Sequence, residues 1–297
     1  MTPPPTPPQA APLRVALIGF GAIGATVWRL LRDAPDRVTL TGLLLRESNA
    51  RAQAAATGAS QGAAVDRHAQ ARAQAGAAQA SLVHRVDDLL ATGPDLVVEC
   101  AGHDALDAYG EATLRAGRDL VVVSVGALAD PRRHDALLAA AREAGRQLIV
   151  PAGAIGGLDI LGAARLAGLH SVCYRSRKPP LAWRGTPAEG QIDLLRLRAP
   201  TVFYRGRARD AALQYPKNAN VAATLALATL GFEHTRVELV ADPGADGNFH
   251  EIDAHGRSGS VTIRIEGVAS PSNPRTSMVT AYSVARAVLN RREALVI

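Results

Sequence analysis

Three glycines near the start of the chain have a spacing that can bind a dinucleotide. Gly19, Gly21 and Gly24 form the pattern Gly-X-Gly-X-X-Gly. In this pattern the first glycine makes a tight turn, the second lets the backbone approach a pyrophosphate, and the third lets a helix pack against a strand. A helix that begins here would point its N-terminal amides at the phosphates. We therefore take these glycines, with the intervening Ala22 and Ile23, as candidate cofactor contacts.

A histidine in the second half of the chain is a candidate for proton transfer. His250 follows Asn248 and Phe249, which we expect to lie in a loop after a strand. An imidazole with a pKa near neutrality can act as a general base. His250 is one of eight histidines, however, and a single loop histidine is more often a solvated residue, so the local pattern leaves both interpretations open.

Neither a metal site nor a catalytic triad is evident along the chain. No set of His, Cys and Glu has the spacing of metal ligands, and no Ser-His-Asp arrangement with a nucleophile elbow occurs. We predict no metal site. A bound hydride-carrying cofactor would then have to supply the difficult step.

Two further segments contain residues that a ligand could use. Asn218 and Asn220 stand at the start of an apolar helix, where Asn218 could simply be the N-cap. Asn220 lies inside that helix and is less easily explained by capping. The glycine-rich segment 151–157 follows the last strand of the first half. It lies where a nicotinamide ring could bind, and it could equally be a hinge between domains.

The elements around the glycines support the dinucleotide interpretation. An apolar strand over 14–18 precedes them and an amphipathic helix over 25–32 follows. Further strands are expected over 38–45, 96–100, 120–124 and 148–150, with helices over 50–80, 103–116 and 132–144. Strands that alternate with helices in this way predict an α/β fold, a Rossmann doubly wound parallel sheet.

The residue after the second strand bears on the choice of dinucleotide. An acidic residue there would hold the ribose 2′-hydroxyl of NAD, whereas an arginine can accommodate the 2′-phosphate of NADP. This chain has Arg46 followed by Glu47. Arg46 is therefore a candidate NADP contact, and a solvated Arg–Glu pair is an equal alternative.

The second half has a different pattern. Expected strands at 171–176, 201–205, 235–241 and 260–266 alternate in polarity and have less helix between them. They predict a second, α+β domain built on a mixed sheet. We divide the chain into a disordered tail (1–12), a dinucleotide-binding domain (13–152) and a substrate and dimerisation domain (153–275), with a C-terminal helix within 276–297 packing back on the first domain.

Composition narrows the class of partner. The chain has 297 residues and a formal charge of +6, but its basic residues are dispersed among acids, so we expect no nucleic-acid partner. It has two cysteines and no apolar run of membrane-spanning length. The proline-rich start lacks the features of a signal peptide. We expect a cytoplasmic protein that does not bind membranes.

Several motifs in fixed order resemble the L-aspartate dehydrogenase family. They are Gly-Phe-Gly-Ala-Ile-Gly (19–24), Val-Glu-Cys-Ala-Gly-His (98–103), Ser-Val-Gly-Ala-Leu (124–128), Gly-Ala-Ile-Gly (153–156), Arg-Lys-Pro-Pro (177–180), Tyr-Pro-Lys-Asn-Ala-Asn-Val (215–221) and Ala-Asp-Pro…Asn-Phe-His (241–250). The likeness runs from about residue 13 to the end, and fails in the proline-rich tail and over 50–80. It implies oxidation of L-aspartate to iminoaspartate with NAD or NADP. It also implies that His250 is catalytic and that Ala154 and Asn220 contact the cofactor.

The substrate of such an enzyme has two carboxylates that need cationic or amide partners. Arg177, Lys178 and Lys217 are the candidates. Two alternatives to aspartate oxidation stay open: a related dehydrogenase of the homoserine or dihydrodipicolinate type, and a dinucleotide-sensing protein without turnover. We also expect a homodimer, with the second sheet as its surface.

Overall fold

The computed structural model describes residues 11–46, 61–216, 218–270 and 273–297, and for residues 61–66, 269–270 and 273–276 it describes the backbone alone. Most of the predicted tail, the first part of the predicted helix over 50–80 and the candidate Lys217 lie outside the described residues. None of the helices in the described ranges combines the length and the apolar character needed to cross a bilayer.

The first half of the chain folds around a parallel sheet of six strands in the order β3-β2-β1-β4-β5-β6. The strands are β1 (Leu13–Ile18), β2 (Val38–Leu44), β3 (Ser81–Val83), β4 (Leu96–Glu99), β5 (Asp119–Val122) and β6 (Leu148–Ile149). This order reverses direction between β1 and β4, which is the doubly wound arrangement of dinucleotide-binding domains. The predicted Rossmann sheet is confirmed.

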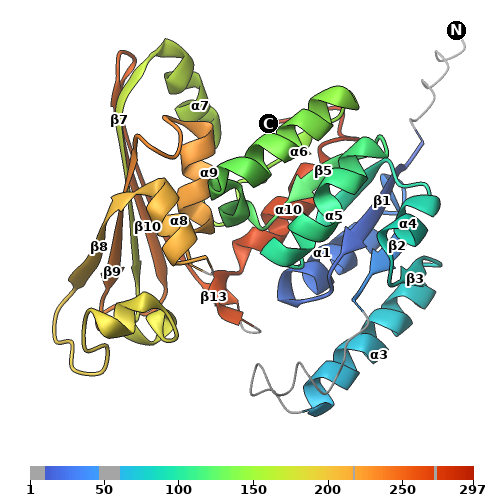
Figure 1. Cartoon of the computed structure of the whole chain (residues 1–297), viewed down its shortest axis with the longest axis horizontal. Helices are drawn as coiled ribbons and strands as arrows, with labels where there is room; N and C mark the ends of the chain where they lie inside the picture. Colours follow the sequence, from blue (N-terminus) through green and yellow to red (C-terminus); the bar gives the residue numbers. More distant parts are fainter. Residues whose placement is uncertain (1–10, 47–60, 217, 271–272) are drawn as a thin grey trace, which may run out of the picture.

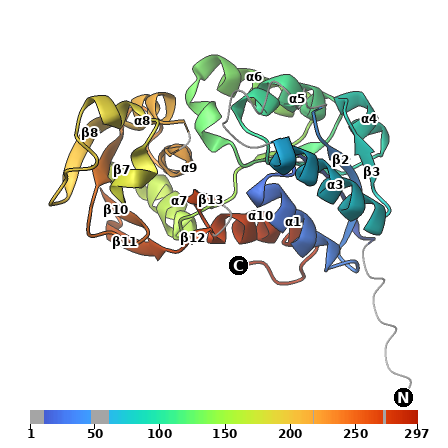
Figure 2. The same cartoon turned by 90° about the horizontal axis from the view of Figure 1, so that it is seen from below.

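Helices cover both faces of this sheet (Figures 1 and 2). One face packs against α1 (Ala22–Arg32), α3 (Gln61–Ala77) and α10 (Val279–Leu289); the other packs against α4 (Val86–Ala91), α5 (His103–Arg115) and α6 (Pro131–Glu143). Strand β1 shows why the sheet needs both layers: Val15 and Leu17 face the first layer, Ala16 and Ile18 face the second, and all four are buried. Near-continuous apolar strands are typical of a sheet covered on two sides.

The second half contains a mixed sheet of five strands in the order β11-β10-β7-β9-β8. The strands are β7 (Leu169–Lys178), β8 (Thr201–Arg207), β9 (Thr235–Ala241), β10 (Asn248–Gly256) and β11 (Gly259–Gly267). Only β7 and β9 are paired in parallel. Helices α7 (Leu158–Ala167), α8 (Ala208–Gln214) and α9 (Asn220–Ala228) lie between this sheet and the first domain (Figure 1). The predicted second domain with a mixed sheet is confirmed.

The chain then returns to the first domain. The short hairpin of β12 (Ala269–Ser270) and β13 (Asn273–Ser277) leads into α10, which packs beside α1 (Figure 2). The 3-10 turn η1 (Val125–Ala129), which follows β5, contacts α8 and α9. The two halves are therefore joined through η1 as well as through the chain itself.

Two local predictions were wrong. Residues 248–250 were expected in a loop, but they begin β10, which is paired with β7 on one side and β11 on the other. The segment is rich in polar residues, and its partners on both sides stabilise it as a strand. Asn218 was offered as the N-cap of a helix; α9 begins at Asn220, and its N-cap Ala219 has no side-chain capping bond.

Candidate functional site

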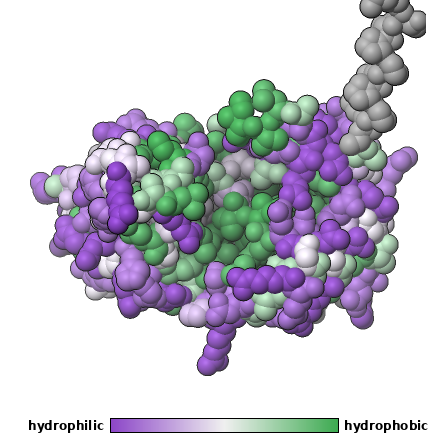
Figure 3. Space-filling model, turned by 90° about the horizontal axis from the view of Figure 1, so that it is seen from above, coloured by the Kyte–Doolittle hydropathy of each residue, from purple (hydrophilic) through white to green (hydrophobic). Residues whose placement is uncertain are grey.

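A cleft lies between the two domains. Its walls come from the start of α1, the ends of β5 and β7, the segment after β6, and the starts of α9, β10 and α10. Viewed from above, apolar residues gather at the base of a hollow between the two halves of the molecule (Figure 3). The cleft opens at the carboxyl edge of the parallel sheet, where ligands of open α/β sheets bind.

The glycine turn has the geometry that a pyrophosphate requires. Gly19 has φ +93°, and a Cβ on it would lie 2.7 Å from the Cβ of Ala101. A Cβ on Gly24 would lie 2.4 Å from the carbonyl oxygen of Gly19. By contrast, a Cβ on Gly21 would meet no atom within 4 Å. Gly19 and Gly24 are therefore needed to make the turn, whereas Gly21 leaves open space over it.

The helix after the turn is suited to phosphate. Gly21 is the N-cap of α1, no side chain caps the helix, and its first turn contains no acidic residue. The exposed amides of a helix start attract anions, and here no carboxylate competes for them. The residues present thus fit a dinucleotide. Ile23 of the same turn lines the cleft.

A buried acid, Glu99, makes hydrogen bonds to the loops at this edge of the sheet. The side-chain oxygen Oε1 of Glu99 accepts hydrogen bonds from the amides of Ala101 (2.7 Å) and Gly102 (2.8 Å), and from Ser124 Oγ (2.9 Å). Its Oε2 accepts from the Ser124 amide at 3.0 Å. Burial raises the pKa of Glu99, and these hydrogen bonds partly oppose that shift. Glu99 therefore ties together the loops that follow β4 and β5.

Sequence reasoning overlooked Glu99, although an acid within the apolar run Leu-Val-Val-Glu-Cys was a visible signal. A carboxylate is seldom fully buried without partners, so such a position predicts a hydrogen-bonded role.

Asn220 connects the two domains at the cleft. Its Oδ1 accepts a hydrogen bond of 2.8 Å from the amide of Gly126 in η1. Ala154 lines the same wall, and the adjacent Gly153 donates its amide to Ser283 Oγ of α10 at 2.9 Å. Asn220 and Ala154 thus line the same cleft as Ile23 at the start of α1.

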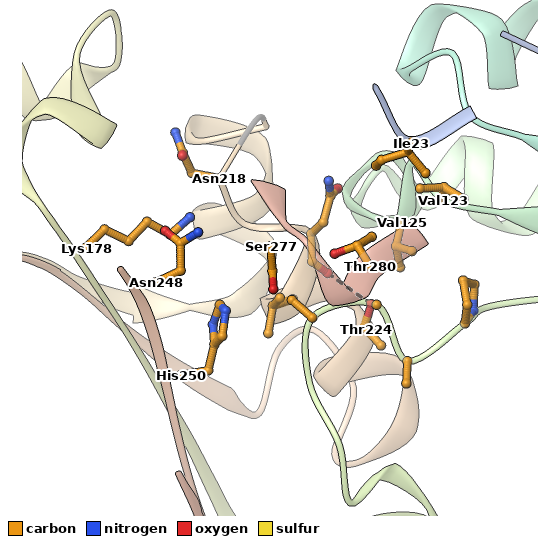
Figure 4. Close-up of a pocket in the computed structure, with 16 residues that line it drawn as sticks. Ile23, Val123, Val125, Lys178, Asn218, Thr224, Asn248, His250, Ser277 and Thr280 are labelled. Atoms are coloured by element: carbon orange, nitrogen blue, oxygen red, sulfur yellow. Dashed lines mark hydrogen bonds between the residues drawn. The ribbon is translucent and has the colours of Figure 1, made fainter. Parts of the chain in front are cut away.

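The opposite wall carries the polar side chains of the second domain (Figure 4). Asn218, Asn248, His250 and Lys178 line the cleft, and each side chain is more than nine-tenths buried. Among the described residues, Asn218 Oδ1 and His250 Nε2 have no hydrogen-bond partner. Buried polar atoms are seldom left unpaired, so these two atoms indicate a place where a ligand binds.

Tyr174 contacts His250 in two ways. The side chain of Tyr174 stacks on its ring at an interplanar angle of 16°, with 6.0 Å between ring centroids. The Tyr174 hydroxyl lies 2.7 Å from Nδ1. Burial first, and the charge of Lys178 second, lower the pKa of His250 to about 3. The imidazole is therefore neutral in the described structure at physiological pH, and Nε2 is the nitrogen that remains for a ligand.

Lys178 is a cation without an acidic partner in the described part of the chain. Its Nζ lies 5.3 Å from the centroid of the Trp183 ring, and burial lowers its pKa to about 8. A buried ammonium that no carboxylate neutralises is costly to the fold, and a bound anion would relieve that cost.

The other candidate residues lie elsewhere. Arg177 projects from the opposite side of β7, where its guanidinium bonds to Asp242 at 2.7 Å and lies 4.1 Å from the centroid of the Phe249 ring. It is absent from the cleft lining. Arg46 follows β2 with an exposed side chain. Within the described ranges, no group of three or more His, Cys, Asp or Glu side chains is arranged to hold a metal ion.

Family models match both halves of the chain. The model described as "Aspartate dehydrogenase, C-terminal" matches residues 159–291, and the one described as "Homoserine dehydrogenase, NAD binding domain" matches residues 19–151. Among solved structures, the aspartate dehydrogenase of Thermotoga maritima has the same fold, with a TM-score of 0.69 at 24% identity over 96% of this chain and 99% of that one.

Curated relatives are similar over nearly the whole length. The L-aspartate dehydrogenase of Ralstonia pickettii is 44% identical over 95% of this chain and 99% of its own length. That of Polaromonas sp. is 46% identical over 96% of this chain and 100% of its own. The L-aspartate dehydrogenase of Pseudomonas aeruginosa is 42% identical over 95% of this chain and 99% of its own length. The resemblance drawn from the motifs is confirmed, and this chain belongs to the L-aspartate dehydrogenase family.

Proposed function

We propose that this protein oxidises L-aspartate to iminoaspartate with NAD or NADP as the hydride acceptor. The imine then hydrolyses to oxaloacetate and ammonia or feeds NAD biosynthesis, and reductive amination runs through the same site. The observation that carries the proposal is the unpaired, buried Nε2 of His250, in a cleft whose opposite wall is a dinucleotide-binding turn.

The proposed roles follow from the positions of the side chains. Gly19, Gly21, Gly24 and the start of α1 hold the pyrophosphate, with Ala154 and Asn220 beside the nicotinamide. The bound dinucleotide supplies hydride acceptance. His250 Nε2 takes a proton from the substrate ammonium, so that the substrate nitrogen has a free lone pair to form the imine, or it activates the water that attacks the imine.

The substrate's negative charge needs partners in the same wall. Lys178 is the cation in the described part of the cleft lining, and Asn248 and Asn218 contribute amides to the same lining. Lys178 thus pairs with one carboxylate. The ion pair of Arg177 with Asp242 makes this arginine a support for the wall behind Phe249 and not a direct contact.

The test is a spectrophotometric screen of amino acids with each dinucleotide, read at the absorbance band of the reduced nicotinamide. Aspartate should give reduced cofactor, while glutamate, alanine and homoserine should give little, because a longer or singly charged substrate misplaces or lacks a carboxylate. An Arg46→Ala variant should lose affinity for NADP more than for NAD. Equal losses would remove Arg46 from the cofactor site.

A second candidate function is oxidation of homoserine. It is favoured by the family model that matches residues 19–151, which is named for homoserine dehydrogenase. That match covers the cofactor half alone, whereas the half that holds His250 and Lys178 matches the aspartate family. Turnover of homoserine at a rate comparable to aspartate in the same screen would favour this alternative, and tight cofactor binding without any turnover would indicate a sensor.

We also propose that the protein works in the cytoplasm as a homodimer. The outer face of the second sheet supports the dimer: it is open and carries ion pairs such as Arg175–Glu238 and Arg205–Glu238. Light scattering coupled to size-exclusion chromatography tests the assembly, and a mass of about 31 kDa would contradict it. The proposed use of NAD or NADP, which are intracellular dinucleotides, supports the cytoplasmic location.

A further inference from the structure

The ring behind His250 sets which of its two nitrogens carries a proton. A neutral imidazole has one N–H and one lone pair. The hydroxyl of Tyr174 can either donate to Nδ1 or accept from it across their 2.7 Å contact. If it donates, Nε2 presents an N–H to the cleft. If it accepts, Nε2 presents a lone pair, which is the form that can take a proton from a substrate.

The direction of this bond depends on where the Tyr174 proton goes. Tyr174 is fully buried, and burial raises the pKa of its hydroxyl, so it keeps its proton. When Tyr174 accepts from Nδ1–H, its own proton must point at a second acceptor. The contact with His250 is the one hydrogen bond that its hydroxyl makes within the described structure.

Ser176 is placed to be that acceptor. It lies two residues beyond Tyr174 on the same buried face of β7, directly opposite His250 in the pairing of β7 with β10. Its Oγ is buried and has no hydrogen bond of standard geometry within the described chain. It is nevertheless near enough to the Tyr174 hydroxyl to lower its pKa, against the larger effect of burial.

We propose that Tyr174 and Ser176 are positioning residues that hold His250 as the Nδ1–H tautomer. Ser176 Oγ accepts the Tyr174 proton, Tyr174 accepts from His250 Nδ1–H, and the Nε2 lone pair faces the cleft. When Nε2 gains a proton, the imidazolium still donates through Nδ1, and Tyr174 neither gains nor loses a proton. This inference rests on the proposed role of His250 as a base.

The direct test is NMR of the full-length protein labelled with ¹⁵N in its histidine rings. The two ring nitrogens of a neutral histidine differ strongly in ¹⁵N shift, depending on which is protonated, and the His250→Asn variant identifies the His250 signals by their loss. The wild type should show a protonated Nδ1 and an unprotonated Nε2. A protonated Nε2 in the wild type would overturn the proposal whether or not aspartate is turned over.

Variants of Ser176 and Tyr174 test the direction of the hydrogen bond between Tyr174 and His250. In Ser176→Ala the Tyr174 proton has no second acceptor, so it turns to Nδ1 and the tautomer flips to Nε2–H. Turnover of aspartate should fall about tenfold, the equivalent of one net hydrogen bond. Adding Tyr174→Phe to Ser176→Ala removes the wrong donor and should restore part of that loss. Ser176→Thr keeps the hydroxyl and should keep both the tautomer and the turnover.

A matched control removes a tyrosine hydroxyl elsewhere. Tyr204 donates to the carbonyl of Arg207 on β8 and is absent from the cleft lining, so Tyr204→Phe should change neither the His250 shifts nor the rate. A loss of turnover in Ser176→Ala with an unchanged tautomer would mean that Ser176 acts by packing alone, and the proposal would fail. If the wild-type tautomer is as expected but aspartate is not oxidised, the failure belongs to the proposed function.

Discussion

His250 and Lys178 share one cleft, and burial disfavours the charged form of each side chain. Burial and the ammonium of Lys178 lower the pKa of His250 to about 3. This differs from the near-neutral pKa expected from the residue type, because a solvated histidine lacks both influences. A substrate with two carboxylates would bring negative charge beside both groups, which would raise both pKa values at the moment of binding.

The low pKa of His250 makes the pH profile of the His250→Asn variant informative. Turnover of aspartate should fall by about 10²–10⁴, while dinucleotide affinity changes little. Because kcat/KM reports the free enzyme, and His250 there is neutral above about pH 3, the wild type and the variant should give parallel profiles between about pH 5 and 7. A wild-type limb near pH 6.5 that the variant lacks would contradict the assigned pKa. Near-normal turnover would remove His250 from the mechanism.

Lys178 should cost the protein stability in a pH-dependent way. Its pKa falls from 10.5 to about 8 on folding, which corresponds to about 3 kcal/mol. Between those two values the unfolded chain binds more protons, so the stability contribution of Lys178 improves as pH rises through this window and is least favourable below pH 8.

We therefore expect Lys178→Met to be more stable than the wild type at pH 7. The difference in free energy of unfolding, measured with urea, should approach 3 kcal/mol at most and shrink steadily towards pH 10.5. The same variant should bind aspartate poorly. A variant that is equally or less stable at pH 7 would show that an unseen partner already neutralises Lys178.

At the scale of elements, the turn before α1 separates a glycine needed for folding from one needed for binding. A Cβ on Gly24 would lie 2.4 Å from the backbone oxygen of Gly19, whereas a Cβ on Gly21 would meet nothing, and Gly21 has an ordinary φ of −78°. Gly21→Ala should keep its stability within about 0.5 kcal/mol and weaken dinucleotide binding at least tenfold. Gly24→Ala should lose stability as well.

Urea unfolding and a titration of NADH fluorescence on both variants measure these two effects separately. Equal losses of stability in Gly21→Ala and Gly24→Ala would mean that the space over Gly21 is not where the phosphates lie.

This turn could be predicted from the sequence because strand, glycines and helix are neighbours in the chain. The Rossmann sheet followed for the same reason, since each strand is apolar and each is followed by its own helix. The strand β10 could not be predicted in this way. His250 becomes buried in a strand that pairs with residues of β7 more than 70 positions away, Ser176 being its direct partner. Likewise the Asn220–Gly126 bond joins residues 94 positions apart.

At the scale of the whole molecule, the two domains share one apolar core. One cluster of buried side chains runs from Ile18 and Leu106 in the first domain through Leu128 of η1 to Leu225 and Tyr174 in the second. A separate cluster under α1 and α10 holds the other face of the first sheet. The cleft therefore opens between parts that are joined by packing.

This shared core predicts that the domains unfold together. The two tryptophans report one domain each: Trp28 lies in α1 and Trp183 beside the second sheet, and both are fully buried. In Trp183→Phe the fluorescence follows the first domain, and in Trp28→Phe it follows the second.

Val288→Ala, in the fully buried face of α10, should cost about 2 kcal/mol for the two methyl groups removed and the cavity left. Added to each single-tryptophan protein, it should lower the urea midpoint of both reporters by the same amount, although α10 packs mainly against α1 of the first domain. Val279→Ala on the same helix is the control, because that side chain is 48% exposed and should change stability by no more than about 0.5 kcal/mol. A midpoint that moves for Trp28 and stays in place for Trp183 would show that the domains unfold independently and that η1 does not couple them.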